Sequence, residues 1–165
     1  MLHPLLSEYD PAESSEGSLD PLGLYSIADD LALKLVPGMR ERHERPRFLT
    51  AYAVSLSLCG EFEPDEVASD HVSEPWQVFE WYVVEGLVRK SGGGGSLHGL
   101  PGRLKAERAI RDGLPLSAGR YLKVPSVFGF HGIYRNLARD LDIECSGRLG
   151  ETGYELLSTW ADEQG

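Results

Sequence analysis

The chain has 165 residues, of which 41% are hydrophobic and 25% charged, and its formal net charge is −10. This length suits one domain, and the composition excludes a wholly disordered or fibrous chain. No apolar run approaches the roughly 18 residues that span a bilayer, so we expect no membrane partner. The N-terminus lacks a basic start and an apolar core of signal-peptide length, so we expect a cytoplasmic protein.

The charge is distributed unevenly along the chain. Residues 1–85 carry a net charge of −12, residues 86–139 carry +8, and residues 140–165 carry −6. The total argues against a nucleic-acid partner, but nucleic-acid binding depends on the local basic surface. The basic middle segment therefore keeps DNA open as a partner. The alternative is that the acidic and basic segments pack against each other.

The N-terminal half is expected to be helical. Residues 1–19, rich in Ser, Glu and Pro, are expected to form a flexible arm. Asp20-Pro21 is typical of a helix start and predicts a helix over 21–35, with an apolar stripe formed by Leu24, Ala28, Leu31 and Leu35. The apolar stretch from Pro46 to Cys59 predicts a largely buried helix that Gly60 ends. A short acidic helix over 64–69 is a further prediction.

An aromatic segment follows. Ser73 and Pro75 predict a helix over 74–85, although its aromatic and β-branched residues also make part of 80–89 a strand candidate. Apolar side chains on all its faces indicate burial or a partner, with four candidate protein-interface residues: Trp76, Phe79, Trp81 and Tyr82. Residues 91–102 are expected to form a flexible connector. Its GGGGS run also matches a common engineered linker, so we assign it no function.

The basic segment predicts two helices. The first spans 103–112 and buries Ala106, Ala109 and Ile110, while Leu104 falls on its charged side. After an extended stretch over 114–125, Ser126 is expected to cap a helix over 127–141. Its core face consists of Phe130, Tyr134, Leu137 and Leu141. A final helix begins near residue 150, with Tyr154, Leu157 and either Trp160 or Ala161 facing inward.

The helix over 127–141 carries a polar stripe opposite its core face. His131, Arg135 and Arg139 recur at intervals of four residues, and Asn136 lies near the same face. Arg and Asn can pair bidentately with guanine and adenine edges, so the stripe suits a helix that faces a DNA groove. A solvated helix face explains the same spacing without any function.

The segment after this helix resembles the C-terminal half of winged-helix domains. Asp142-Ile143-Glu144, a Cys-Ser-Gly turn and Arg148-Leu149 are similar to a short wing, and Gly150-Glu151-Thr152-Gly153-Tyr154-Glu155-Leu156-Leu157 is similar to the helix that follows it. The resemblance covers about 126–160 and identifies no particular family. It departs from the usual pattern at Gly150, where Ser or Thr is the common cap. It implies a DNA-binding fold with Arg148 as a wing contact.

A weaker resemblance lies upstream. Glu85-Gly86-Leu87-Val88-Arg89-Lys90 follows a helix in the way a basic wing does, with Arg89 and Lys90 as wing contacts. The expected fold is therefore mainly α with a small β wing. A helical support over 20–90 carries a winged-helix-like domain over 103–165, and the alternative places a first winged-helix-like unit over 46–100.

The sequence contains no recognised pattern of a catalytic or metal-binding site. The histidines are scattered, and no HExxH, GxSxG or Cys/His cluster occurs. We therefore expect no enzyme, no cofactor and no metal site. Cys59 and Cys145 are expected to be reduced thiols.

These observations predict a non-catalytic protein that binds double-stranded DNA. Basic side chains are expected to contact phosphates, namely Arg103, Lys105, Arg108, Arg111, Arg120 and Lys123. The alternative is a protein–protein adaptor in a larger DNA-processing or phage-defence complex, with other subunits or a second copy as partner. A continuous positive surface over 103–139 favours DNA, and burial of these residues against acidic segments favours the adaptor.

Overall fold

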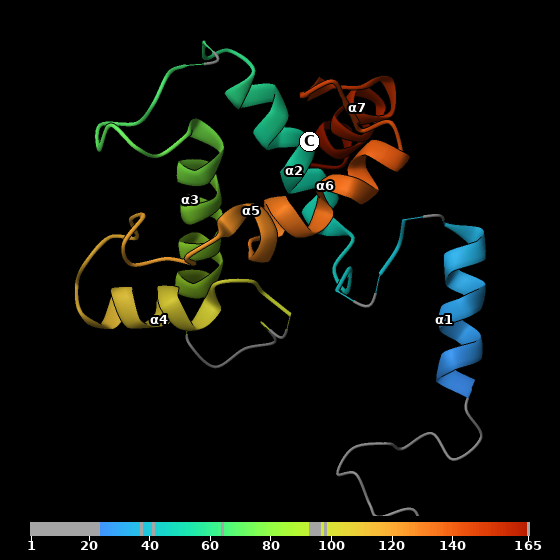
Figure 1. The fold of residues 1–165 in the computed structure, drawn as a ribbon, viewed down its shortest axis with the longest axis horizontal. Helices are drawn as coiled ribbons and strands as arrows, with labels where there is room; N and C mark the ends of the chain where they lie inside the picture. Colours follow the sequence, from blue (N-terminus) through green and yellow to red (C-terminus); the bar gives the residue numbers. More distant parts are fainter. Residues whose placement is uncertain are drawn as a thin grey trace, which may run out of the picture. The chain divides into compact units, whose positions relative to one another are not determined.

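The computed structural model describes residues 24–36, 38–40, 42–63, 65–92, 97 and 99–164. These residues form seven helices and one two-stranded antiparallel sheet (Figure 1), which confirms the predicted mainly helical fold with a small β element. The chain divides into two compact units, Met1–Val36 and Pro37–Gly165. Three predicted features lie partly or wholly outside the described residues: the arm over 1–19, the helix start at Asp20-Pro21, and residues 93–96 and 98 of the connector.

The first unit contains helix α1, Leu24–Leu35, as the apolar spacing predicts. No residue of α1 is buried within the chain, and Leu24, Leu31 and Leu35 are all exposed. Among the described helices, none combines the length and apolar content that a bilayer span requires.

Helix α2, Arg47–Cys59, lies at the centre of the second unit. It ends at Gly60, whose N–H donates to the Leu56 carbonyl, so the predicted helix and its stop are confirmed. Helices α3 (Pro75–Lys90), α6 (Phe130–Asp140) and α7 (Glu151–Gln164) all pack on α2. The core around it consists of Tyr52, Ala53, Ala138 and Ile143, with Leu49, Leu56, Leu141, Leu149, Leu156 and Leu157 packed against them.

Helix α3 continues to Lys90, so the predicted strand within 80–89 is wrong. Trp81, Val84 and Val88 recur at helical spacing and are buried where α3 packs on α4, Arg103–Arg111. This continuous apolar stripe outweighs the β-propensity of the segment. Because the helix runs through Arg89 and Lys90, the basic wing predicted there is wrong too.

Helix α4 matches its prediction closely. Ala106 and Ala109 are buried, Ile110 is half-buried, and Leu104 is 69% exposed on the charged side. The predicted acidic helix over 64–69 is wrong, because its described residues, 65–69, form turns and irregular chain. There the Asp70 carboxylate accepts hydrogen bonds from the N–H and hydroxyl of Ser73, at 2.8 and 2.5 Å, and such local bonds compete with helix formation.

The predicted helix over 127–141 is divided into α5, Pro125–Phe128, and α6. The break lies at Gly129, which is extended and takes the N-cap position of α6, so the predicted cap at Ser126 is wrong. A Cβ on Gly129 would lie 2.0 Å from the Glu80 carboxylate, so a side chain there would have to displace this buried group. Phe130, Tyr134 and Leu137 form the buried face of α6, as predicted.

A tight hairpin follows α6, as the sequence predicts. Strands β1 (Glu144–Cys145) and β2 (Arg148–Leu149) pair antiparallel, with Glu144 opposite Leu149. Helix α7 then packs on α2. Its Gly153 lies against the hairpin, where a Cβ would lie 2.6 Å from the Leu149 side chain and 2.7 Å from the Ile143 carbonyl oxygen.

The predicted inward face of α7 is partly wrong. Leu157 is half-buried against the core, but Tyr154 and Trp160 are 66% and 43% exposed. The close approach at Gly153 turns Tyr154, the next residue, outward. Ala161, the alternative to Trp160, is exposed too, as are all the other residues from Ser158 to Gln164.

Candidate nucleic-acid interface

Five basic side chains extend from α4 and the loop that follows it. This α4 basic surface consists of Lys105, Arg108, Arg111, Arg120 and Lys123, all of which are exposed. None of the five forms an ion pair with any residue that the structure describes. Arg103, also predicted as a contact, is paired with Glu107 at 3.6 Å.

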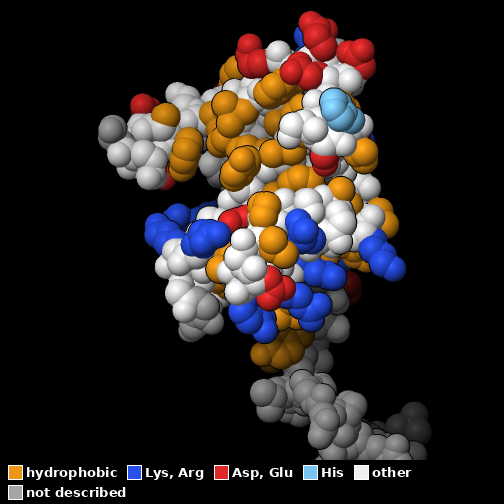
Figure 2. Space-filling view, turned by 90° about the vertical axis from the view of Figure 1, so that its left-hand side faces the viewer, with side chains coloured by type: hydrophobic (Ala, Val, Ile, Leu, Met, Phe, Trp, Pro, Cys, Tyr) orange, Lys and Arg blue, Asp and Glu red, His pale blue; other side chains and the backbone are white. Residues whose placement is uncertain are grey.

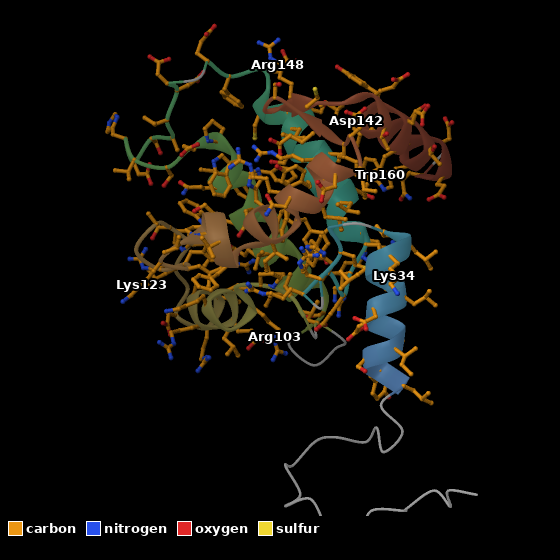
Figure 3. All side chains as sticks on the ribbon, turned by 45° about the vertical axis from the view of Figure 1, so that its right-hand side comes forward. Lys34, Arg103, Lys123, Asp142, Arg148 and Trp160 are labelled. Atoms are coloured by element: carbon orange, nitrogen blue, oxygen red, sulfur yellow. The ribbon has the colours of Figure 1, made fainter. Side chains whose placement is uncertain are left out.

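A buried tyrosine brings the loop against the start of α4. Tyr121 is 3% exposed, and its ring packs so closely on Gly102 that a Cβ there would lie 2.2 Å away. Gly102 also has φ +75°, a conformation that favours glycine. Arg120 and Lys123 flank Tyr121, so they are held beside the first turn of α4. Figure 3 shows Arg103 and Lys123 at this end of the second unit and Arg148 at the opposite end.

Acidic side chains gather away from this surface. Figure 2 shows Lys and Arg side chains mainly over the lower part of one face, whereas Asp and Glu gather at its upper end. The basic residues of α4 are thus not buried against the acidic segments. The exposed cations on α4 and the loop after it agree with the prediction of nucleic-acid contact. Arg135 and Arg139, however, pair with the buried Glu144, so the predicted continuous positive surface over 103–139 is not formed.

His131 does not share the outer face of α6 with the two arginines. It is 9% exposed, and its ring lies between Tyr52 and Trp76, with centroid distances of 4.5 and 4.3 Å. The prediction that His131 faces outward is therefore wrong. Residue 131 belongs to the first turn of α6, which packs against α2 and α3.

Arg135 and Arg139 of α6 are held by a buried carboxylate. The Glu144 side chain is only 1% exposed. Arg139 donates a hydrogen bond from Nε to Glu144 Oε1 at 3.0 Å. Its Nη2 forms an ion pair with the same oxygen at 2.9 Å, as does Arg135 Nε at 3.7 Å. The Tyr52 hydroxyl donates to Glu144 Oε2, and burial together with this bond raises the pKa of Tyr52. Both arginine side chains are still 47% exposed, so they are oriented but reachable.

The remaining predicted contacts are dispersed. Arg89 donates to Glu85 within α3, at 2.7 and 3.0 Å, and Lys90 is exposed in the last turn of the same helix. Asn136 is exposed on α6, and Arg148 is exposed on β2. The structure therefore does not join all the predicted basic residues into one surface.

Glu80 is a key polar residue that the sequence argument missed. It is fully buried, accepting from the Tyr121 hydroxyl at 2.7 Å and from the backbone N–H of His131 at 3.0 Å. It thereby takes the place of an N-cap side chain for α6. Burial raises the pKa of Glu80 to about 7. The available signal was a single carboxylate within the aromatic segment FEWYVV.

The four predicted protein-interface residues mostly face inward. Trp81 is 9% exposed, Phe79 is half-buried, and half-buried Trp76 stacks on His131. Tyr82 is the exception, with 76% of its surface exposed.

Comparison of the chain with protein-family models, curated proteins and solved structures finds no match.

Proposed function

We propose that this chain is a non-catalytic, cytoplasmic DNA-binding protein whose α4 basic surface contacts phosphates. The observation that carries the proposal is the group of five exposed cations without an acidic partner among the described residues. Cations that bind phosphates release condensed counterions, which favours association and makes it depend on salt. The net charge of −10 does not oppose this contact strongly, because repulsion from distant acidic residues is screened beyond about 10 Å at 0.1 M salt.

A second part of the proposal concerns a winged-helix arrangement. Helix α6, the β1–β2 hairpin and α7 follow one another as in such domains, and Arg135, Asn136 and Arg139 would face a groove with Arg148 on the wing. What supports this part is the exposed half of each arginine side chain on α6. His131 is no longer included, because it is buried.

The experiment is a titration of a fluorescein-labelled duplex, followed by anisotropy at several salt concentrations. Arg108→Gln/Arg111→Gln should weaken binding and reduce the slope of log K against log salt by about 2, because each lost phosphate contact is worth about 0.9. Lys34→Gln/Arg47→Gln removes the same charge from exposed positions outside the α4 basic surface and should leave the slope near that of wild type. Equal slopes for the two double variants would refute phosphate contact by α4.

The second part has its own variants. Asn136→Ala and Arg148→Gln change exposed side chains that hold no buried partner, so their folding should be unaffected. Weaker binding by both variants supports the groove and wing contacts. Unchanged affinity for both would remove α6 and the hairpin from the interface and leave α4 alone.

An adaptor role is the second candidate, and Tyr82 favours it. This exposed ring borders a hollow of about 270 Å³ between α3 and residues 115–117. Trp81 lines the same hollow, and its indole N–H, which is closed off from solvent, has no hydrogen-bond partner among the described residues. A pull-down from the native host after nuclease treatment tests this role. Proteins retained by wild type and lost with Tyr82→Ser would support an adaptor.

A further inference from the structure

A second and larger hollow lies where the end of α2, the start of α3 and the β1–β2 turn meet. Its volume is about 720 Å³. Tyr52, His131 and Glu144 line it from the core side, and Trp76 and exposed Phe62 contribute aromatic walls. It is separate from the α4 basic surface, none of whose residues lines it.

His131 is a buried polar side chain in this hollow whose ring has no hydrogen-bond partner. Only its backbone N–H is bonded, to Glu80, and neither ring nitrogen bonds to any described residue. The two ring nitrogens of His131 are not among the fully buried atoms that lack a partner, and His131 lines the hollow. A molecule in the hollow can therefore reach the ring. Burial, followed by the charge of Arg135, lowers the pKa of His131 to about 4. The ring is therefore neutral near pH 7, with one nitrogen lone pair free to accept a hydrogen bond.

The charges that line the hollow are predominantly negative. Its outer part carries four carboxylates, and its inner part contains Glu144, already bound to two arginines. Apart from Arg135, which belongs to that inner group, Arg148 is the remaining arginine along the lining. The four outer carboxylates belong to Glu61, Glu63, Glu66 and Glu74. This balance favours a cation over an anion as the occupant.

We propose that this hollow binds an arginine side chain presented by a partner polypeptide. The planar guanidinium group stacks on the Trp76 and Phe62 rings, donates to the free nitrogen of His131 and is neutralised by the outer carboxylates. Charge complementarity selects this occupant, and the flat, five-donor guanidinium uses the aromatic walls and the imidazole better than the ammonium of lysine does. This contact does not involve the α4 basic surface, but Arg135 and Arg148, which are proposed as groove and wing contacts to DNA, also line the hollow.

The test uses N-acetyl-arginine amide as the probe and N-acetyl-citrulline amide as its neutral isostere. The imidazole resonances of His131 and the indole resonance of Trp76 are followed by NMR. We expect the arginine probe to shift the His131 and Trp76 resonances saturably. The citrulline probe should bind at least about tenfold more weakly, because it lacks the charge-assisted hydrogen bond. Equal shifts with both probes, or no shift with arginine, would overturn the proposal. Inorganic phosphate that shifts the same resonances more strongly would overturn it in favour of an anion site.

Two variants locate the binding. His131→Phe keeps the ring stack and removes the acceptor nitrogen, and Glu63→Gln/Glu66→Gln removes outer charge from exposed positions. Both should weaken arginine binding by about tenfold or more, read from the Trp76 indole. The matched control, Glu155→Gln/Glu163→Gln on exposed positions of α7, should bind like wild type. If His131→Phe fails to fold, the Glu63/Glu66 variant decides, and wild-type affinity in that variant would overturn the proposal.

Discussion

Glu80→Gln tests whether the buried carboxylate beneath α6 makes stability depend on pH. The pKa of Glu80 is raised from 4.5 to about 7 in the folded chain because the carboxylate is buried. Between these values the folded protein keeps a proton that the unfolded chain releases. The free energy of unfolding therefore falls as pH rises through this window and becomes flat above it.

The magnitude follows from the size of the pKa difference. The full effect is about 3 kcal/mol, because each unit is worth about 1.4 kcal/mol. Measurements should begin near pH 5.5, above the sequence pI of 4.9, where the protein carries net negative charge. Between about pH 5.5 and about pH 8, the same linkage relation predicts that the free energy of unfolding falls by about 2 kcal/mol.

The assay is urea unfolding, followed by tryptophan fluorescence, of wild type and Glu80→Gln at several pH values. Glutamine has nearly the same shape and does not titrate, so the variant lacks this component. The wild-type free energy of unfolding minus that of the variant should decrease by about 2 kcal/mol across the range. A constant difference would refute the raised pKa. A difference that increases with pH would mean that the α6 amides and Tyr121 favour the ionised form more than burial disfavours it.

Two further substitutions test the packing around the buried carboxylates, and a third, at an open position of α3, serves as a comparison. Gly129→Ala should destabilise the protein by about 2 kcal/mol, since its Cβ would lie 2.0 Å from a Glu80 oxygen. Gly86→Ala, where no atom lies within 4 Å of the new Cβ, should stabilise α3 by about 1 kcal/mol. Urea unfolding measures the change in the free energy of unfolding for both glycine variants. Changes of the same sign in the two variants would contradict the geometry. Glu144→Gln should lower the free energy of unfolding by about 2 kcal/mol, because the two half-exposed arginines lose their ion pairs with a buried carboxylate. An unchanged midpoint of thermal unfolding would show that these ion pairs do not stabilise the fold.

Local patterns predict most of the secondary structure of this chain. Helix α2 and its stop at Gly60, helix α4 with its two buried alanines, and the hairpin after α6 all match their expectations. In each case the signal is short-range: apolar spacing, a terminating glycine, or a turn between two short extended segments. Leu104 was correctly placed on the charged side of α4 for the same reason.

Local patterns do not reveal contacts between residues that are distant in sequence. Glu80 on α3 accepts hydrogen bonds from Tyr121 and from a backbone amide of α6, both of which are distant from it in sequence. The residues near Ser126 therefore do not indicate that α6 begins after Gly129. His131 shares its spacing with Arg135, yet the packing of Tyr52 and Trp76 places it inside.

The sequence by itself determined the positions of most helices and that the positive charge is concentrated between residues 86 and 139. Tertiary structure alone decided how that charge is divided. The α4 basic surface remains unpaired among the described residues, whereas Arg135 and Arg139 are held by Glu144. The physical reason is that burying a carboxylate requires compensating donors, and which arginines supply them depends on the positions of β1 and α6 in space.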